Sequence, residues 1–265
     1  MKQRMSSEFI FQLFALLIAI IVVHALYVGL VRPSADADMR EQLERQAAGE
    51  DFVPERTLAV VIRDFEQEAC FILLLWALAI MAYKARQIMK EQQLLDQSLL
   101  AIPEGTSVLP EDAREYSRAI EALPARQQDY LLPRTLLSAL QRFATTGSIQ
   151  AVSDTIRENC DVESDRLDSE MSMVRYIAWA IPSIGFIGTV RGIGDALGQA
   201  YKAVEGDISG VTASLGVAFN STFVALVLSI IIMFCLHQLQ LAQERLVLDS
   251  QRYADRNLLR HLVAQ

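Results

Sequence analysis

The sequence is poor in the residues that most often build metal, disulfide and nucleophilic sites. It has three cysteines and three histidines among 265 residues, and none of them cluster with metal-ligand spacing. Three cysteines do not make a disulfide framework. There is no P-loop, no nucleophile elbow and no H-E-x-x-H motif. We therefore expect no cofactor, no resident metal and no enzymatic activity.

Positive charge is also scarce. Lys and Arg number 24 against 32 Asp and Glu, which gives a net charge of -8 and a pI near 5.0. Nucleic-acid binding needs a basic face, so that partner class is not expected. What the sequence does have is apolar residues, at 52% with a mean hydropathy of +0.25. With 21% charged residues as well, the composition indicates a membrane protein with a substantial aqueous part.

Four stretches are apolar and long enough to cross a bilayer as helices, which takes about 20 residues. They are residues 9–31, 65–84, 176–197 and 211–236. The predicted fold is an all-α membrane protein with four transmembrane helices. A helical cytoplasmic domain is expected from the loop between spans two and three together with the extended C-terminal helix.

Basic residues next to the spans predict the orientation. Lys2 and Arg4 precede the first span, and Lys84, Arg86 and Lys90 follow the second. Since positive residues stay inside, both termini are expected in the cytoplasm. The expected segments are the N-terminus with span one (1–31), a periplasmic segment (32–64), span two (65–84), a cytoplasmic helical segment (85–175), spans three and four (176–236) and a cytoplasmic C-terminal helix (237–265).

The first span could also be read as a signal peptide, because Ala35-Asp36-Ala37 has the small-x-small pattern of a cleavage site. Its apolar run exceeds the usual signal core of about 7–15 residues, which favours a retained span. Cleavage would leave three spans.

In the cytoplasmic segment, Leu136, Leu137, Leu140 and Phe143 form an apolar stripe at helical spacing that stops near Gly147. This pattern predicts a helix with one buried face.

Span three contains a proline and three closely spaced glycines. Gly185, Gly188 and Gly192 remove side-chain bulk, which favours close helix packing in a membrane. Pro182 removes one backbone hydrogen bond, and a simple kink is the favoured interpretation over a gating role.

Hydroxyl and amide side chains lie in the middle of spans three and four. Thr189 sits among the glycines, and Asn220, Ser221 and Thr222 are consecutive in span four. Polar groups at one depth on neighbouring spans favour a hydrated ion path, because unsatisfied polar groups in lipid are costly. The plainer alternative for each threonine is a hydrogen bond to a carbonyl of its own helix.

Arg191 and Asp195 are four residues apart on one helix face and are expected to pair. An intramembrane charge is a functional hypothesis, whereas an interfacial arginine that extends to the headgroups is the alternative. Spans three and four carry no acidic residue near mid-membrane. A proton relay there would need a titrating group from a partner helix.

The residues from Pro182 to Ile193 read P-S-I-G-F-I-G-T-V-R-G-I. They resemble the P-x-x-G-L-x-G-T-V-x-G-I signature of the MotA/TolQ/ExbB family of ion-channel motor subunits. The stretch from Ala218 to Thr222 is similar to the final membrane helix of that family, which carries its second pore threonine.

The resemblance implies five such subunits around two single-span partner helices in the bacterial inner membrane. The partner would be MotB-, TolR- or ExbD-like and would bring a membrane aspartate. Thr189 and Thr222 would line the path beside that aspartate, and proton flow would drive rotation. There are departures: Val217 stands where TolQ and ExbB carry a glutamate, and Arg191 replaces a common tryptophan. Four spans resemble MotA, whereas TolQ and ExbB have three, so the energised process stays open.

Three alternatives remain. Sodium could replace the proton, since Asn220 and Ser221 add oxygen ligands beside Thr222. The glycines could serve only to pack a non-conducting scaffold. An intramembrane enzyme would need a base beside Ser183 or Ser221, and no histidine is expected at that depth.

Overall fold

The chain folds into helices and divides into two compact units. The computed structural model describes residues 2–48, 57–103 and 105–263, and these ranges contain helices and no β-strand. The first unit comprises Met1–Met81 and Met173–Leu236, and the second comprises Ala82–Ser172 and His237–Gln265. Four of the helical stretches are long and apolar enough to cross a membrane. The all-α prediction with four candidate spans is therefore confirmed.

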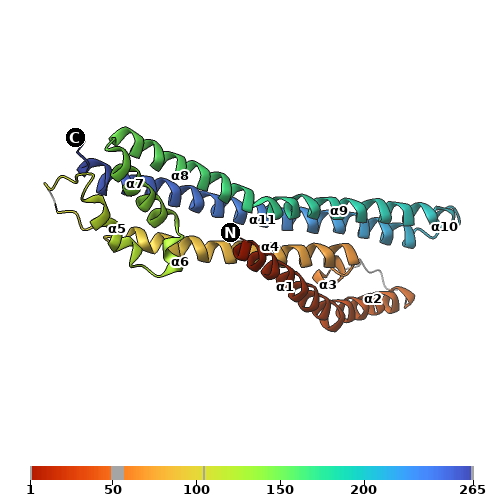
Figure 1. Ribbon diagram of the computed structural model, residues 1–265. Helices are drawn as coiled ribbons and strands as arrows, with labels where there is room; N and C mark the ends of the chain where they lie inside the picture. The colour runs from red at the N-terminus through yellow and green to blue at the C-terminus, as the bar shows by residue number, and fades with distance from the viewer. Residues whose placement is uncertain (1, 49–56, 104, 264–265) are drawn as a thin grey trace. The chain divides into compact units, whose positions relative to one another are not determined.

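The first helical stretch is continuous but bent. It consists of α1 (Lys2–Leu26), a π-helical turn (Tyr27–Val31) and α2 (Arg32–Ala47), and Figure 1 shows the change of direction between α1 and α2. A π-turn widens the helix by one residue and is a known cause of bending. The helix thus runs past Val31, where the sequence placed the start of an external segment. Of that segment's acidic residues, Glu50, Asp51 and Glu55 lie outside the described residues.

The second span begins at the expected residue. A short helix, α3 (Leu58–Val61), precedes α4 (Phe65–Leu95). Thr57 caps α3, since its side chain accepts a hydrogen bond from the Val60 N–H. The Trp76 Nε1 of α4 donates to the Gln12 carbonyl of α1 at 2.9 Å, which links the first two spans.

The remaining part of the first unit is a helical hairpin. It is formed by α9 (Ser172–Gly198), the short α10 (Ala200–Val204) and the first half of α11 (Ser209–Asn257), and α9 and α11 run side by side (Figure 1). Pro182 lies inside α9 and leaves the carbonyl four residues earlier, at Ala178, without its helical donor. The Ser229 hydroxyl of α11 donates to that carbonyl at 3.3 Å.

The second unit is a helical domain with its own apolar core. Its helices are the later parts of α4 and α11, with α5 (Ala113–Glu121), α6 (Ala125–Gln128), α7 (Leu131–Thr146), α8 (Ile149–Glu170) and a 3-10 turn (Leu259–His261). The predicted stripe is confirmed: Leu136, Leu140 and Phe143 are fully buried, and Leu137 packs against the core. Gly147 ends α7 at φ +60°, a conformation that glycine adopts without strain.

The C-terminal end of the second unit is held by backbone pairing. α11 ends at Asn257 rather than continuing as a helix to the last residues. The Val108 N–H donates to the His261 carbonyl at 2.8 Å, and the Val263 N–H donates to the Val108 carbonyl at 3.2 Å. Leu258 is buried in the core beneath this contact.

Ion pairs join α4, α7 and α8 within the second unit. Lys84 Nζ lies 2.6 Å from a Glu170 carboxylate oxygen, and Arg134 lies 2.8 Å from Glu163. Arg166 reaches both carboxylates, at 3.2 Å from Glu163 and 3.0 Å from Glu170. Lys84 and Glu163 are almost fully buried, so each charge has its partner where desolvation would otherwise be costly.

Candidate functional site

The site is built on a seam of small residues between α9 and α11. A Cβ placed on Gly188 would lie 2.6 Å from the Cβ of Ser221, and one on Gly192 would lie 2.8 Å from the Cβ of Ala218. A Cβ on Gly185 would also meet α11, because it would collide with the Ala225 Cβ and lie 3.1 Å from the Ser221 carbonyl oxygen. The helices approach closely because these three positions have no side chain.

The two predicted threonines meet across this seam. The Thr189 and Thr222 hydroxyls are hydrogen-bonded to each other. The Thr189 hydroxyl also contacts the Ala218 carbonyl at 3.0 Å and the Gly185 carbonyl at 3.3 Å, and the Thr222 hydroxyl contacts the Gly185 carbonyl at 3.2 Å. Thr189 therefore bonds to its own helix, as the plain alternative expects, and also to the neighbouring one.

Four oxygens thus gather at one point of the hairpin. Each hydroxyl carries one proton, so the two protons cannot satisfy every contact at once, and lone pairs remain available. Both threonine side chains are only half buried. Such a group can orient water or coordinate a cation, but threonine does not exchange protons at ordinary pH.

The structure separates the three consecutive polar residues of span four. Thr222 faces Thr189, whereas Ser221 is 1% exposed and faces Gly188 and Gln67. The Asn220 side chain is half exposed and makes no hydrogen bond within the described part of the chain. Consecutive helical residues point about 100° apart, so these side chains cannot share one face.

Arg191 pairs mainly with a residue that the sequence did not suggest. Its guanidinium binds both carboxylate oxygens of Glu66, at 2.6 and 2.8 Å. The expected partner Asp195 lies farther away, at 3.7 Å, and Asp64 lies at 4.0 Å. Burial raises the pKa of the Asp64 carboxyl above its ordinary value, although Arg63 and Arg191 act in the opposite direction.

The first turn of α4 supplies polar residues that sequence reasoning missed. Glu66, Gln67 and Glu68 precede the apolar part of this span. Gln67 and Glu68 are 1% and 6% exposed, and Gln67 Nε2 donates to the Ser221 hydroxyl at 3.3 Å. The signal was present, because three consecutive polar residues at the start of a span are unusual and need partners.

Glu68 forms a second cluster with span one. The His24 Nδ1 lies 2.7 Å from one of its carboxylate oxygens, and Arg32 pairs with the other. The Arg32 guanidinium also lies 4.5 Å from the centre of the Phe65 ring. His24 is thus engaged by a carboxylate.

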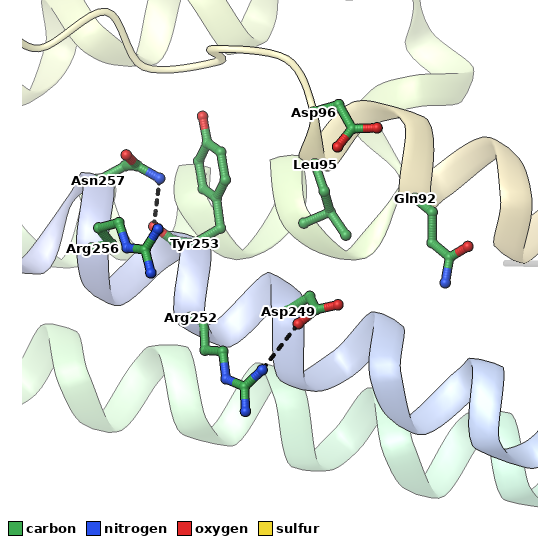
Figure 2. Close-up of a pocket in the computed structure, with 8 residues that line it drawn as sticks. All are labelled: Gln92, Leu95, Asp96, Asp249, Arg252, Tyr253, Arg256 and Asn257. Carbon is green, nitrogen blue, oxygen red and sulfur yellow. Dashed lines mark hydrogen bonds and ion pairs between the residues drawn. The ribbon is translucent and has the colours of Figure 1, made fainter.

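A pocket of about 440 Å³ lies in the second unit. It is lined mostly by charged and polar residues, from the end of α4 with the following Asp96 and from α11. Figure 2 shows the Arg252–Asp249 ion pair, whose atoms are 3.3 Å apart, and the hydrogen bond from Asn257 to the Tyr253 carbonyl. The Tyr253 hydroxyl donates to the Gln97 carbonyl at 3.2 Å and accepts from the Leu99 N–H. Because these lining side chains bind one another or nearby backbone groups, we assign them a structural role.

Metal-binding clusters of His, Cys, Asp and Glu do not occur among the described residues. Cys70, Cys160 and Cys235 are all free thiols. The chemistry available to the site is therefore that of hydroxyls, carbonyls, an amide and ion pairs.

Comparison with known proteins gives one finding. Residues 127–252 match the model of the MotA/TolQ/ExbB proton channel family, which confirms the resemblance drawn from the glycine-threonine motif. The match takes in Thr189, Thr222 and the three seam glycines, and extends over α7 and α8. Comparison with curated proteins and with solved structures yields no match.

Proposed function

We propose that this chain, whose residues 127–252 belong to the MotA/TolQ/ExbB proton channel family, is the ion-conducting subunit of a motor in the bacterial inner membrane. Proton flow down its gradient would pass beside α9 and α11 and would be coupled to mechanical work through a single-span partner subunit. Both termini would lie in the cytoplasm, as would residues 85–175.

The observation that carries the proposal is the contact between Thr189 and Thr222. Two hydroxyls from different spans meet at a seam of glycines, inside the segment that matches the family. A scaffold needs the glycines for packing, but it has no need of hydroxyls with free lone pairs at the same level. An ion path does need them, because an ion in lipid requires oxygens to replace its water.

The partner is expected to carry the mobile carboxylate. Among the described residues, Glu66 lies at the seam and is engaged by Arg191, and Glu68 is engaged by Arg32 and His24. A MotB-, TolR- or ExbD-like helix with a membrane aspartate would supply a free one. Five copies of this chain around two such helices would place a threonine pair beside each position that the aspartate visits.

Sodium is the second candidate ion. Two hydroxyl and two carbonyl oxygens converge at Thr189, Thr222, Gly185 and Ala218. A set of neutral oxygens suits a hard cation as well as a water chain.

Purification of the tagged chain from its native membranes in mild detergent tests the proposal. The expected result is a ring of five copies holding a small single-span protein with a membrane aspartate. The mass of the intact complex gives the number of copies, and sequencing of the co-purified chain identifies the partner. A self-assembled ring without such a partner would contradict the motor and would favour a scaffold held together by the glycine seam.

A further inference from the structure

Three helices of the first unit meet at the bare Cα of Gly188. A Cβ built there would lie 2.6 Å from the Ser221 hydroxyl oxygen of α11 and 3.3 Å from the Glu66 Cγ of α4. Thus Ser221 and Glu66 approach α9 from two sides at the residue that precedes Thr189. The three helices pack this closely because Gly188 has no side chain, and even alanine there would force Ser221 or its helix to shift.

Gln67 completes the group from the same turn of α4. It is 1% exposed, and its Nε2 donates at 3.3 Å to both the Val61 carbonyl and the Ser221 hydroxyl. These bonds set the orientation of the amide, because the flipped amide would place its oxygen against the Val61 carbonyl.

One acceptor and one donor at this point have no hydrogen-bond partner among the described residues. The Gln67 Oε1 is buried, and no donor reaches it from the described residues. The Ser221 hydroxyl accepts from Gln67, and its own proton has no acceptor in the same part of the chain. Nearly all buried polar atoms in proteins are satisfied, by protein or by ordered water.

A water molecule is the ligand that fits this donor set. Buried waters occupy polar sites where two to four groups can bind them. Here a water would donate to Gln67 Oε1 and accept from Ser221, with the Glu66 carboxylate close by. Because Arg191 binds that carboxylate with two hydrogen bonds, the region carries charge of both signs and remains polar.

We propose that Gln67 and Ser221 hold a water molecule beside Glu66, and that this water is a station of the proton path next to the threonine pair. The inference rests on the proposed function. The transfer balances: the water takes a proton onto its lone pair and releases another from its own O–H bonds. Gln67 thereby makes span two part of the path. It meets the path at Gly188 and Ser221, the residues that precede Thr189 and Thr222.

Replacement of Gln67 by leucine tests the station. The variant keeps the side-chain bulk but removes the acceptor and the donor. The matched control is Gln243→Leu in the second unit, where a 5% exposed glutamine also has an unpartnered amide atom. Both are compared with the wild type as complexes purified with their partner and reconstituted in liposomes, with internal pH read from a fluorescent dye.

The expected result is a fall in proton flux of about tenfold for Gln67→Leu, the order expected from the loss of one hydrogen bond in the conducting state. The control should conduct normally. Gln67→Leu leaves the Ser221 hydroxyl and the Val61 carbonyl without their donor, so its melting temperature should fall by a few degrees. Flux is therefore compared only between complexes that remain assembled. Wild-type flux in Gln67→Leu would overturn the station.

Two further arms keep the test decisive. Gln67→Glu retains acceptor oxygens and should keep flux near the wild-type level, a comparison that does not need the leucine variant to assemble. A tenfold fall in Gln67→Glu would overturn the station. A high-resolution structure of the complex should show a water within hydrogen-bond distance of Gln67 Oε1 and Ser221 Oγ, and a dry site there overturns the inference whatever the flux. The station alone fails if Gln67→Leu conducts like the wild type while Thr189→Val does not conduct. The proposed function itself fails if the wild-type complex conducts no ion.

Discussion

From Gly185 to Ala196, every buried residue of α9 is a glycine or an alanine, whereas the buried residues of α7 include Leu136, Leu140 and Phe143. The large side chains of that part of α9 point outward, with Phe186, Ile187 and Val190 more than half exposed. This part of α9 thus turns its large side chains outward, whereas α7 turns its large side chains into the core.

The solvent explains the difference. In water, burial of large apolar side chains drives folding, and α7 follows that rule. In lipid, a buried leucine gains nothing over one that faces the acyl chains, so helices associate through close backbone packing and polar contacts. The seam between α9 and α11 therefore has the packing of membrane helices, and α7 has the packing of a helix in an aqueous domain, which fits a multi-pass membrane protein.

The largest expected effect comes from Gly188→Leu. A side chain there would collide with Ser221, whose Cβ and Oγ lie 2.6 Å from the position of the new Cβ. Overpacking costs about 1–3 kcal/mol even in cores that adjust, and a helix seam has less freedom, so we expect loss of the assembled complex. Gly194→Leu is the matched control, because nothing lies within 4 Å of its Cβ position. Size-exclusion chromatography of both variants measures the difference, and equal yields would contradict the seam.

Truncation in the second unit should act through its core. Leu140→Ala removes a fully buried side chain and should lower stability by about 2–5 kcal/mol. Phe186→Ala, on the outward face of α9, should leave the fold of the chain nearly unchanged. Thermal unfolding in detergent compares the two variants. A larger loss of stability for Phe186→Ala would contradict the difference drawn between α9, with its large side chains outward, and α7, with its large side chains buried.

Removal of the Glu66–Arg191 pair should have a moderate effect. Arg191→Gln leaves the Glu66 carboxylate without its bidentate partner, and the cost is reduced because Arg191 is 43% exposed. We expect about 1 kcal/mol. The charge-exchanged double variant, Glu66→Arg with Arg191→Glu, is compared in thermal unfolding with its two single variants. Its loss of stability should be smaller than the sum of the two single losses, and additive losses would contradict an interaction between the two side chains.

The smallest effect is expected at Ser229. Ser229→Ala leaves the Ala178 carbonyl, already freed by Pro182, without its donor. Because that hydrogen bond is long, at 3.3 Å, the cost should be about 0.5 kcal/mol, the low end of the usual range. In a Pro182→Ala background the carbonyl regains its helical N–H, so the same serine substitution should cost less. A double-mutant cycle of melting temperatures measures the coupling, and zero coupling would dismiss the role of Ser229.

Helices and their apolar faces could be predicted from the sequence because they depend on local order. The stripe at Leu136, Leu140 and Phe143, the stop at Gly147 and the start of α4 at Phe65 all follow from spacing and turn chemistry. The Gly-Thr motif was also readable, because it is a local pattern, and it lies within the segment that matches the family model.

Contacts between distant segments could not be predicted in the same way. Glu66 and Arg191 are 125 residues apart, and Gln67 and Ser221 are 154 apart, so no local pattern joins them. Arg191 was therefore paired with Asp195, the nearest acid on its own helix. The grouping of Asn220 and Ser221 with Thr222, by contrast, could have been rejected from the sequence alone. Consecutive residues of a helix point about 100° apart, so the three side chains cannot share one face.

The measurement that tests the central claim most directly is proton flux through the reconstituted complex with Thr189→Val and Thr222→Val, alone and together. Valine keeps the shape and removes the hydroxyl, so assembly should be normal and flux should fall below detection in the double variant. Thr212→Val is the control, since the Thr212 hydroxyl contacts only the Ile208 and Ser209 carbonyls within the described residues, and it should conduct as the wild type does. Wild-type flux with both seam threonines replaced would contradict the account.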